Sequence, residues 1–243
     1  MKQNVLVLAL TRMHEGRICI GGIFEGTKEW VRPVLPHPGI SRKHLWFNNK
    51  LQIRLFGITE FDLEKQKARP PHTEDWEWNL ANPTKLVKYI SSENIRKKIL
   101  DSIIDNKAED IIENQKRSLG IIKPKKILGF VYSFEKKLKL RLSFIDNDDK
   151  QYKLPITDLN WSALCFHLFE NKEMNVEAIN RYLSRQVKDK EVYLGIGKGR
   201  PWAKDIGEEK KIYNNLVISI LTIPDYAGTR TYYDFEKMLG REL

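Results

Sequence analysis

Short runs in which apolar and polar residues alternate dominate the first third of the chain. Such period-two runs, bounded by Gly, Pro, Asn or charged residues, predict β-strands over 5–10, 17–23, 29–34 and 51–58. From Pro83 to Gln115 the apolar residues instead recur every three or four positions, which predicts a helical spacer. Strand alternation returns at 127–134, 138–145 and 152–156. The chain therefore reads as two β-rich parts separated by a helical part.

The second β-rich part carries helical patterns as well. Thr157-Asp158 is a typical helix start and predicts a helix from Leu159 to Glu170, and a second helix is expected from Val176 to Val187. Runs at 192–196 and 216–223 predict closing strands. The fold class expected is mainly β with inserted helices, that is, α+β.

The two parts also echo one another. The turn at 24–27 precedes Trp30-x-x-Pro33-Val34, and the turn at 146–149 precedes Tyr152-x-x-Pro155-Ile156. A repeat placed after a hairpin turn in both halves indicates an internal duplication. We expect a first barrel over 1–82, a helical spacer over 83–117, and a second barrel with inserted helices and a tail over 118–243. Small five-stranded Greek-key barrels of this size bind single strands through one face and its flanking loops.

Charge favours an anionic partner. The chain has 42 Lys and Arg against 32 Asp and Glu, a net charge of +10 and a pI near 9.4. The excess is spread over both halves, so folding must assemble any basic surface. Cys19 and Cys165 lie in apolar runs, without the spacing of a zinc site or a redox pair, which fits a reducing cytoplasm. The apolar run Val5–Leu10 is too short for a signal peptide or a membrane span. We expect a cytoplasmic protein with no cofactor and no membrane partner.

The segment from Thr11 to Val34 is the strongest candidate for binding. It places Arg12, Arg17, Trp30 and Arg32 on one hairpin and its entry loop. Trp30 and Arg32 are two residues apart on a strand and share a face, where a ring that stacks on a base and a cation that meets a phosphate would lie together. The alternative is that Trp30 belongs to the core and the arginines are merely solvated.

Two further segments offer cations beside apolar strand positions. The run from Gly195 to Trp202 has three glycines with Lys198, Arg200 and Trp202, but neither the P-loop nor the dinucleotide spacing. Its alternative is a glycine-rich bulge with a buried Trp. Lys139 and Arg141 alternate with leucines, which places both cations on one solvent-facing strand surface.

The run His72-Thr73-Glu74-Asp75-Trp76 is the best enzymatic candidate, since a His beside two carboxylates is suited to metal binding or acid–base work. Neighbouring residues point in different directions, however, so Glu74 and Asp75 are poorly placed to chelate one ion. We favour a structural role in which an acid pairs with Arg12, Arg17 or Arg32 while Trp76 packs on the barrel. A base-reading role for the carboxylate ranks between these.

Several motifs together resemble those of a known family. They are TRMHEGRICIGGI followed by EWVRPV, PPHTEDWEW at 70–78, RLSFIDNDDKQYKLPITDLNW at 141–161 and YLGIGKGRPW at 193–202. The chain is similar over most of its length to bacterial proteins that contain a dual OB domain. Arg12, Gly16, Arg17, Trp30 and Arg32 match the pattern, whereas Met13 stands where a basic residue is expected. The resemblance implies two tandem OB-like barrels, recognition of nucleic acid or nucleotides, and a setting in defence against phages and other mobile elements. It transfers no catalytic residues.

Three functions are weighed on this basis. The leading hypothesis is a non-catalytic protein that binds single-stranded DNA or RNA. The second is a nucleotide or modified-base sensor that acts with a separate effector protein. The third and least favoured is a metal-dependent nuclease centred on His72, Glu74 and Asp75. The residues expected at a nucleic-acid interface are Arg12, Arg17, Trp30, Arg32, His72, Glu74, Trp76, Lys139, Arg141, Lys198, Arg200 and Trp202.

Overall fold

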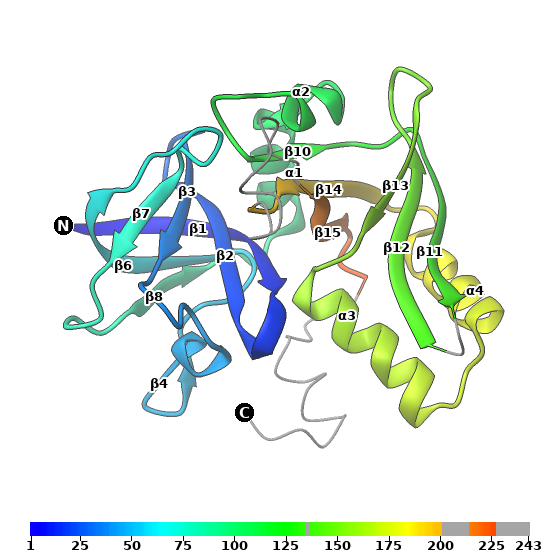
Figure 1. Ribbon diagram of the computed structural model, residues 1–243, viewed down its shortest axis with the longest axis horizontal. Coiled ribbons are helices and arrows are strands. Elements are labelled where there is room, and N and C mark those ends of the chain that lie inside the picture. The colour runs from blue at the N-terminus through cyan, green and yellow to red at the C-terminus, as the bar shows by residue number, and fades with distance from the viewer. Residues whose placement is uncertain (135–136, 201–213, 227–243) are drawn as a thin grey trace, which may run out of the picture.

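The chain is mainly β with inserted helices, as the sequence predicts. A computed structural model describes residues 1–134, 137–200 and 214–226 (Figure 1). Its strands are β1 (Lys2–Arg12), β2 (Ile18–Phe24), β3 (Trp30–Val34), β4 (Trp46–Phe47), β5 (Lys50–Leu51), β6 (Gly57–Gln66), β7 (Asp75–Trp78), β8 (Lys85–Tyr89), β9 (Ile104–Asp105), β10 (Leu119–Ile122), β11 (Lys126–Phe134), β12 (Lys137–Ile145), β13 (Gln151–Pro155), β14 (Glu191–Lys198) and β15 (Asn215–Ile223). Its helices are α1 (Glu93–Ser102), α2 (Glu109–Ile112), α3 (Leu159–Phe166) and α4 (Val176–Val187), with short turns η1 (His14–Gly16), η2 (Arg42–Leu45) and η3 (His167–Asn171).

The first five long strands close into a barrel. β1 pairs with β2, β2 with β3, β3 with β7, β7 with β6, and β6 returns to β1. The β3–β7 pair is parallel and the other pairs are antiparallel. β8 adds to the outer edge of β6. Alternate residues of β1 and β6, such as Val5, Val7 and Phe61, fill the interior and are fully buried.

The second half repeats this strand order. β11 pairs with β12 and β12 with β13, while β15 pairs with β14 and β14 with β10. A parallel bridge between Ile156 and Val217 joins the end of β13 to β15. Only residues 123–125 separate β10 from β11. These two strands together therefore correspond to a single, bent first strand of the second barrel. The Trp30-x-x-Pro33 and Tyr152-x-x-Pro155 repeats fall on the equivalent third strands, β3 and β13.

The two barrels lie against one another. Ala9 of β1 packs with Leu119 of β10 and Ile218 of β15 in a small buried cluster. Gly21 on β2 faces the Leu119 side chain. A Cβ atom added at Gly21 would lie 3.4 Å from that side chain. At the end of β1, the Arg12 amide donates to the Thr157 carbonyl at 2.7 Å. The contact surface of the first barrel is therefore the outer side of β1 and β2.

Two helices of the second barrel follow the sequence closely. Asp158 caps α3 by accepting from the Trp161 amide at 2.9 Å, as predicted from Thr157-Asp158. The helix ends at Phe166 and continues as η3, one residue past the expected end at Glu170. α4 has the predicted bounds, and Asn175 caps it. α4 flanks the outer side of β11, where Asn180 hydrogen-bonds the Phe130 and Val131 amides (Figure 1).

The helical prediction for 83–115 is partly wrong. Residues 85–89 form strand β8, because β6 offers them a ladder of backbone hydrogen bonds that overrides the apolar spacing. β8 thus belongs to the first sheet, although the predicted domain bounds themselves stay a prediction. The strand predicted over 51–58 is also wrong, since Phe56 has a φ of 58° and makes a turn before β6 begins at Gly57.

Candidate nucleic-acid interface

Barrels of this kind bind ligands over the second and third strands and over the loops that join strands one to two and four to five. In the first barrel these elements are β2, β3 and residues 13–17 and 67–74. In the second barrel they are β12, β13 and the segments 135–136 and 199–214. Residues 135–136 and 201–213, and with them Trp202, lie outside the described residues. The predicted interface residues can now be placed on this frame.

The predicted hairpin face exists, but the second barrel covers it. Trp30 and Arg32 do point to one side of β3, because Val31 between them lies fully buried in the barrel core. Trp30 is half-buried and packs against the cluster of Ala9, Leu119 and Ile218. Arg32 is only 6% exposed. The expectation that Arg32 is open to a phosphate is therefore wrong. The part of the Trp30 ring that packs on this cluster is likewise not open to a base.

Arg32 is instead held by the acids of β7 and its entry. Parallel pairing of β3 with β7 sets Arg32 opposite Asp75, and its Nε donates to Asp75 Oδ1 at 2.5 Å. Glu74 Oε1 lies 3.6 Å from Arg32 Nη2. Both carboxylates are about as buried as the guanidinium, at 3% exposure each. The favoured structural interpretation, an acid paired with an arginine, is confirmed.

Ser118, at the start of β10, connects this pair to the second barrel. Its hydroxyl donates to Glu74 Oε1, lies 3.3 Å from Arg32 Nη1 and 2.8 Å from His72 Nδ1. Burial, with Arg32 close by, lowers the pKa of His72 to about 4, so the imidazole is neutral near pH 7. Sequence reasoning missed Ser118, which it treated as a boundary residue. A Ser directly before an apolar strand was the available clue.

This Ser–His–Glu contact resembles a nucleophile with a base, but its geometry does not serve catalysis. Ser118 has no solvent exposure, and Glu74 and His72 are 3% and 7% exposed. A nucleophile must reach its substrate as well as its base. The residues described hold no group of three or more His, Cys, Asp or Glu arranged to bind a metal. The cluster of Arg32, His72, Glu74, Asp75 and Ser118, here called the junction cluster, is a buried polar contact between the barrels.

The two described cations of the glycine-rich run differ in exposure. Lys198 is buried, donates to the Asn114 carbonyl, and has its pKa lowered by burial. Arg200 is 65% exposed at its side chain, and its Nη2 lies 2.7 Å from Asp75 Oδ2. Arg200 can therefore face a ligand from the edge of the junction cluster, whereas Lys198 serves the fold.

The remaining first-barrel candidates lie at its rim. Arg12 is exposed, with its guanidinium over the Phe166 ring at 5.1 Å. Arg17 is partly exposed and pairs with Glu15 at 3.2 Å. Trp76 is half-buried and packs edge-on against Phe24, with ring centroids 5.7 Å apart, as the structural interpretation expects.

The second barrel presents its corresponding face to solvent. Leu140, Leu142 and Phe144 on β12 point into the core, so Lys139 and Arg141 point outward, as predicted. Lys153 on β13 stands opposite Ser143 and shares that outer side. Lys139 and Lys153 are exposed, and Arg141 is half-exposed with Nη1 3.3 Å from the Lys153 carbonyl. We call Lys139, Arg141 and Lys153 the β12–β13 cationic face.

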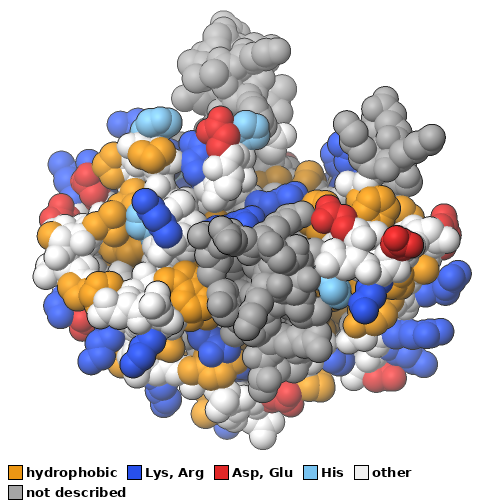
Figure 2. Space-filling model, turned by 90° about the horizontal axis from the view of Figure 1, so that it is seen from below, with side chains coloured by type: hydrophobic (Ala, Val, Ile, Leu, Met, Phe, Trp, Pro, Cys, Tyr) orange, Lys and Arg blue, Asp and Glu red, His pale blue; other side chains and the backbone are white. Residues whose placement is uncertain are grey.

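Other charges are dispersed. Figure 2 shows Lys and Arg side chains over much of the described surface on one side of the molecule, mixed with acidic and apolar side chains. Many cations elsewhere have acidic partners, such as Lys97 and Lys123, which both bind Glu191. No helix within the described ranges is long and apolar enough to cross a membrane.

A closed first barrel and a second barrel of the same strand order, the second with a cationic outer face, define a binding module of the oligonucleotide/oligosaccharide-binding, or OB, class. A family model, the Dual OB-containing domain, matches residues 3–213. The chain belongs to this family. A comparison with curated proteins found no match.

Proposed function

We propose that the protein binds single-stranded DNA or RNA through the β12–β13 cationic face. The observation that carries the proposal is the contrast between the two barrels. The face of the first barrel is buried against the second, while Lys139, Arg141 and Lys153 stay at the surface on the equivalent strands of the second. Single-strand binders combine such a cationic groove with aromatic rings that stack on bases.

The flanking segments complete this interface in the proposal. Arg200 is exposed at the start of the segment that joins the fourth and fifth strands of the second barrel. Trp202 follows two residues later in the sequence, and we assign it the stacking role that the β12–β13 cationic face lacks. A setting in prokaryotic defence, with a separate effector, rests on the family resemblance and is part of the same proposal.

The nuclease alternative is disfavoured by the contacts of its expected centre. Glu74 and Asp75 are buried and engaged by Arg32 and Ser118, and the His72 pKa of about 4 suits a structural imidazole. A base-reading role for Glu74 meets the same obstacle, since its carboxylate is 3% exposed.

Fluorescence anisotropy with labelled single-stranded DNA, single-stranded RNA and duplex DNA tests the proposal. Affinity should favour single strands and fall steeply between low and moderate salt, because each phosphate contact releases counterions. A Lys139→Glu/Arg141→Glu variant should lose most of the affinity. The matched control is Lys85→Glu/Lys88→Glu, which makes the same change of net charge on exposed positions of β8.

Equal loss in both variants would show a mere effect of net charge and would contradict a localised face. Binding that is flat with salt would contradict phosphate contacts. The same probes, incubated with Mg²⁺ or Mn²⁺ and inspected for cleavage, test the nuclease alternative, which predicts cleavage that Asp75→Asn abolishes.

A further inference from the structure

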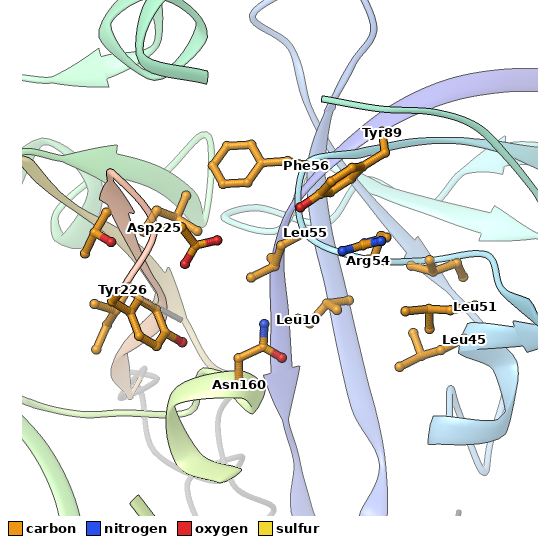
Figure 3. A pocket seen from close by; sticks show the side chains of 14 residues that line it. Leu10, Leu45, Leu51, Arg54, Leu55, Phe56, Tyr89, Asn160, Asp225 and Tyr226 are labelled. Carbon is orange, nitrogen blue, oxygen red and sulfur yellow. The ribbon is translucent and has the colours of Figure 1, made fainter. Parts of the chain in front are cut away.

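The space between the two barrels is too small to receive a ligand. The region that Figure 3 shows, which Leu10, Asn160 and Tyr226 help to line, encloses about 40 Å³. A cavity of that size has room for a few water molecules, and a water there can donate to the buried Asn160 Oδ1. The larger and more open space lies on the second barrel.

This second space is a groove of about 290 Å³ between α4 and β11. It is lined from both elements by Ile127, Phe130, Ser184, Arg185, Val187 and Lys188. We call it the α4–β11 groove. Figure 1 shows α4 at the edge of the second barrel, on the side away from the first barrel. The groove is therefore separate from the contact between the barrels and accessible to a partner.

Asn180 fixes the position of α4 against β11. Its Oδ1 accepts from the Phe130 and Val131 amides at 2.9 and 3.1 Å, and its Nδ2 donates to the Val131 carbonyl at 2.9 Å. The helix then continues to Val187, and the groove lies between this last part of α4 and the start of β11. Both walls are regular elements that are already held together, so docking requires little ordering of the groove.

Three exposed cations follow one side of α4 at the groove. Arg181, Arg185 and Lys188 are four and three residues apart, so they are neighbours on the helix surface. None of the three has an acidic partner in the part of the chain that the structure describes, in contrast to Lys123, which binds Glu191. The helix dipole favours cations in the last turn, but it does not account for the apolar groove beside them.

Cations beside an apolar groove suit an acidic peptide better than a nucleic-acid strand. An apolar patch with a polar rim is typical of a protein-binding surface, and complementary charges fix the register of the partner. A nucleic-acid strand needs exposed rings on which its bases stack. Among the described residues that line the groove, Ile127 and Val187 are aliphatic and the one ring, Phe130, is fully buried.

We propose that the α4–β11 groove docks an acidic segment of a partner protein. One or two apolar side chains of the segment lie in the groove, and its carboxylates pair with Arg185 and Lys188. None of Lys139, Arg141 and Lys153 lines this groove, so docking here does not depend on single-strand binding at the β12–β13 cationic face. An effector protein of the kind proposed above would carry such a segment.

Fluorescence anisotropy of the full chain with a short labelled peptide tests the groove. The peptide consists of Asp and Glu residues around one Phe and one Leu, and it should bind saturably at low salt. A second peptide, with Ser in place of Phe and Leu, should bind about tenfold or more weakly, because the apolar anchors carry much of the energy of such interfaces. A third, with Asn and Gln in place of the acids, should lose about as much.

An Arg185→Glu/Lys188→Glu variant tests the place of binding. Its affinity for the first peptide should fall about tenfold or more. The matched control is Lys85→Glu/Lys88→Glu, which makes the same change of net charge on β8 and should leave peptide binding unchanged. Thermal melts compare the folding of these proteins. Arg185→Gln/Lys188→Gln, which removes the two charges without reversing them, should also weaken binding and guards against a loss of folding in the Glu variant.

Failure of the first peptide to bind, equal affinity for the Ser-containing peptide, or equal loss in the β8 control would overturn the proposal. Binding of oligonucleotides separates this outcome from the proposed function. Arg185→Glu/Lys188→Glu should bind single strands normally, and Lys139→Glu/Arg141→Glu should bind the peptide normally. Loss of oligonucleotide affinity in the Arg185→Glu/Lys188→Glu variant, without loss of peptide affinity, would show that the groove contacts nucleic acid and would refute the peptide site.

Discussion

Arg32 Nε and Asp75 Oδ1 lie 2.5 Å apart although 43 residues separate them in the chain. The pair exists because β3 and β7 run parallel, with Arg32 directly opposite Asp75. Its burial, and its links to Ser118 and Arg200, place it where the two barrels meet. The pair therefore links the first barrel to the second.

Breaking this pair should be costly. Asp75→Asn leaves the Arg32 charge buried with one acid fewer, and we expect a loss of about 3–5 kcal/mol in the free energy of unfolding. Equilibrium urea unfolding measures it. Glu77→Gln on the same strand is the control, since Glu77 pairs with Lys67 at a partly exposed site and should cost about 1 kcal/mol or less. Similar losses in both variants would show that the junction cluster contributes no more to stability than an exposed ion pair does.

Arg200 should matter for nucleic-acid binding and little for stability. It pairs with Asp75 but is 65% exposed, so Arg200→Ala should change the unfolding free energy by about 1 kcal/mol or less. If Arg200 meets a phosphate, the slope of log affinity against log salt should fall by about one in the same variant. Arg181→Ala, at an exposed position of α4, should change neither quantity. An unaltered salt slope in Arg200→Ala would remove this residue from the interface.

His72 should make stability depend on pH. Its pKa in the folded protein, about 4, lies below the usual histidine pKa of 6.5, so between these pH values the unfolded chain carries a proton that the folded chain does not. The contribution of His72 to the free energy of unfolding should therefore rise between pH 4 and pH 6.5, by up to about 3 kcal/mol. Arg32, Arg200, Lys198 and Asp75 are the charged groups that act on this imidazole.

Comparison with His72→Asn isolates this contribution, since an amide does not titrate. Asp158 has the opposite effect on the pH dependence of stability, because burial raises the Asp158 pKa to about 7. The contribution of Asp158 to stability is therefore lost as pH rises from about 4 to 7. Urea unfolding of both proteins at pH 5 and pH 7 gives the difference. The wild-type protein should gain more stability between these pH values than the variant, and parallel profiles would refute the assignment.

Asp158 should also matter more than an ordinary helix cap. One oxygen caps α3 at Trp161, and the other accepts from the Ile220 amide of β15 at 2.7 Å. Asp158→Ala should cost about 2 kcal/mol or more, against about 1 kcal/mol for Asn175→Ala, which caps α4 at its exposed end. Urea unfolding compares them. Equal costs would mean that the bond to Ile220 adds nothing.

Local structure was predictable where a few neighbouring residues decide it. Asp158 and Asn175 accept from amides three residues on, so the starts of α3 and α4 follow from the sequence. β8 did not follow, because Leu86 and Val87 fit either a helix or a strand and the pairing with β6 decides. The turn at Phe56 was likewise not predictable, because it needs a positive φ, which an apolar residue in the sequence does not indicate.

The site was only half predictable for a related reason. Strand alternation correctly placed Trp30 with Arg32 and Lys139 with Arg141, each pair on one side of its strand. Alternation does not reveal what lies on that side. Leu119 and Ser118 cover the first pair because the second barrel docks there, and that docking depends on contacts between residues far apart in the chain.

Docking of one barrel face against the other also limits stoichiometry. If only the β12–β13 cationic face grips a strand, one molecule should occlude the length typical of a single OB fold, roughly 4 to 16 nucleotides, and not twice that length. A long strand would then be covered by many copies arranged in a row. In that case the first barrel would support the binding surface of the second barrel. It would not lengthen the stretch of nucleic acid that each molecule binds.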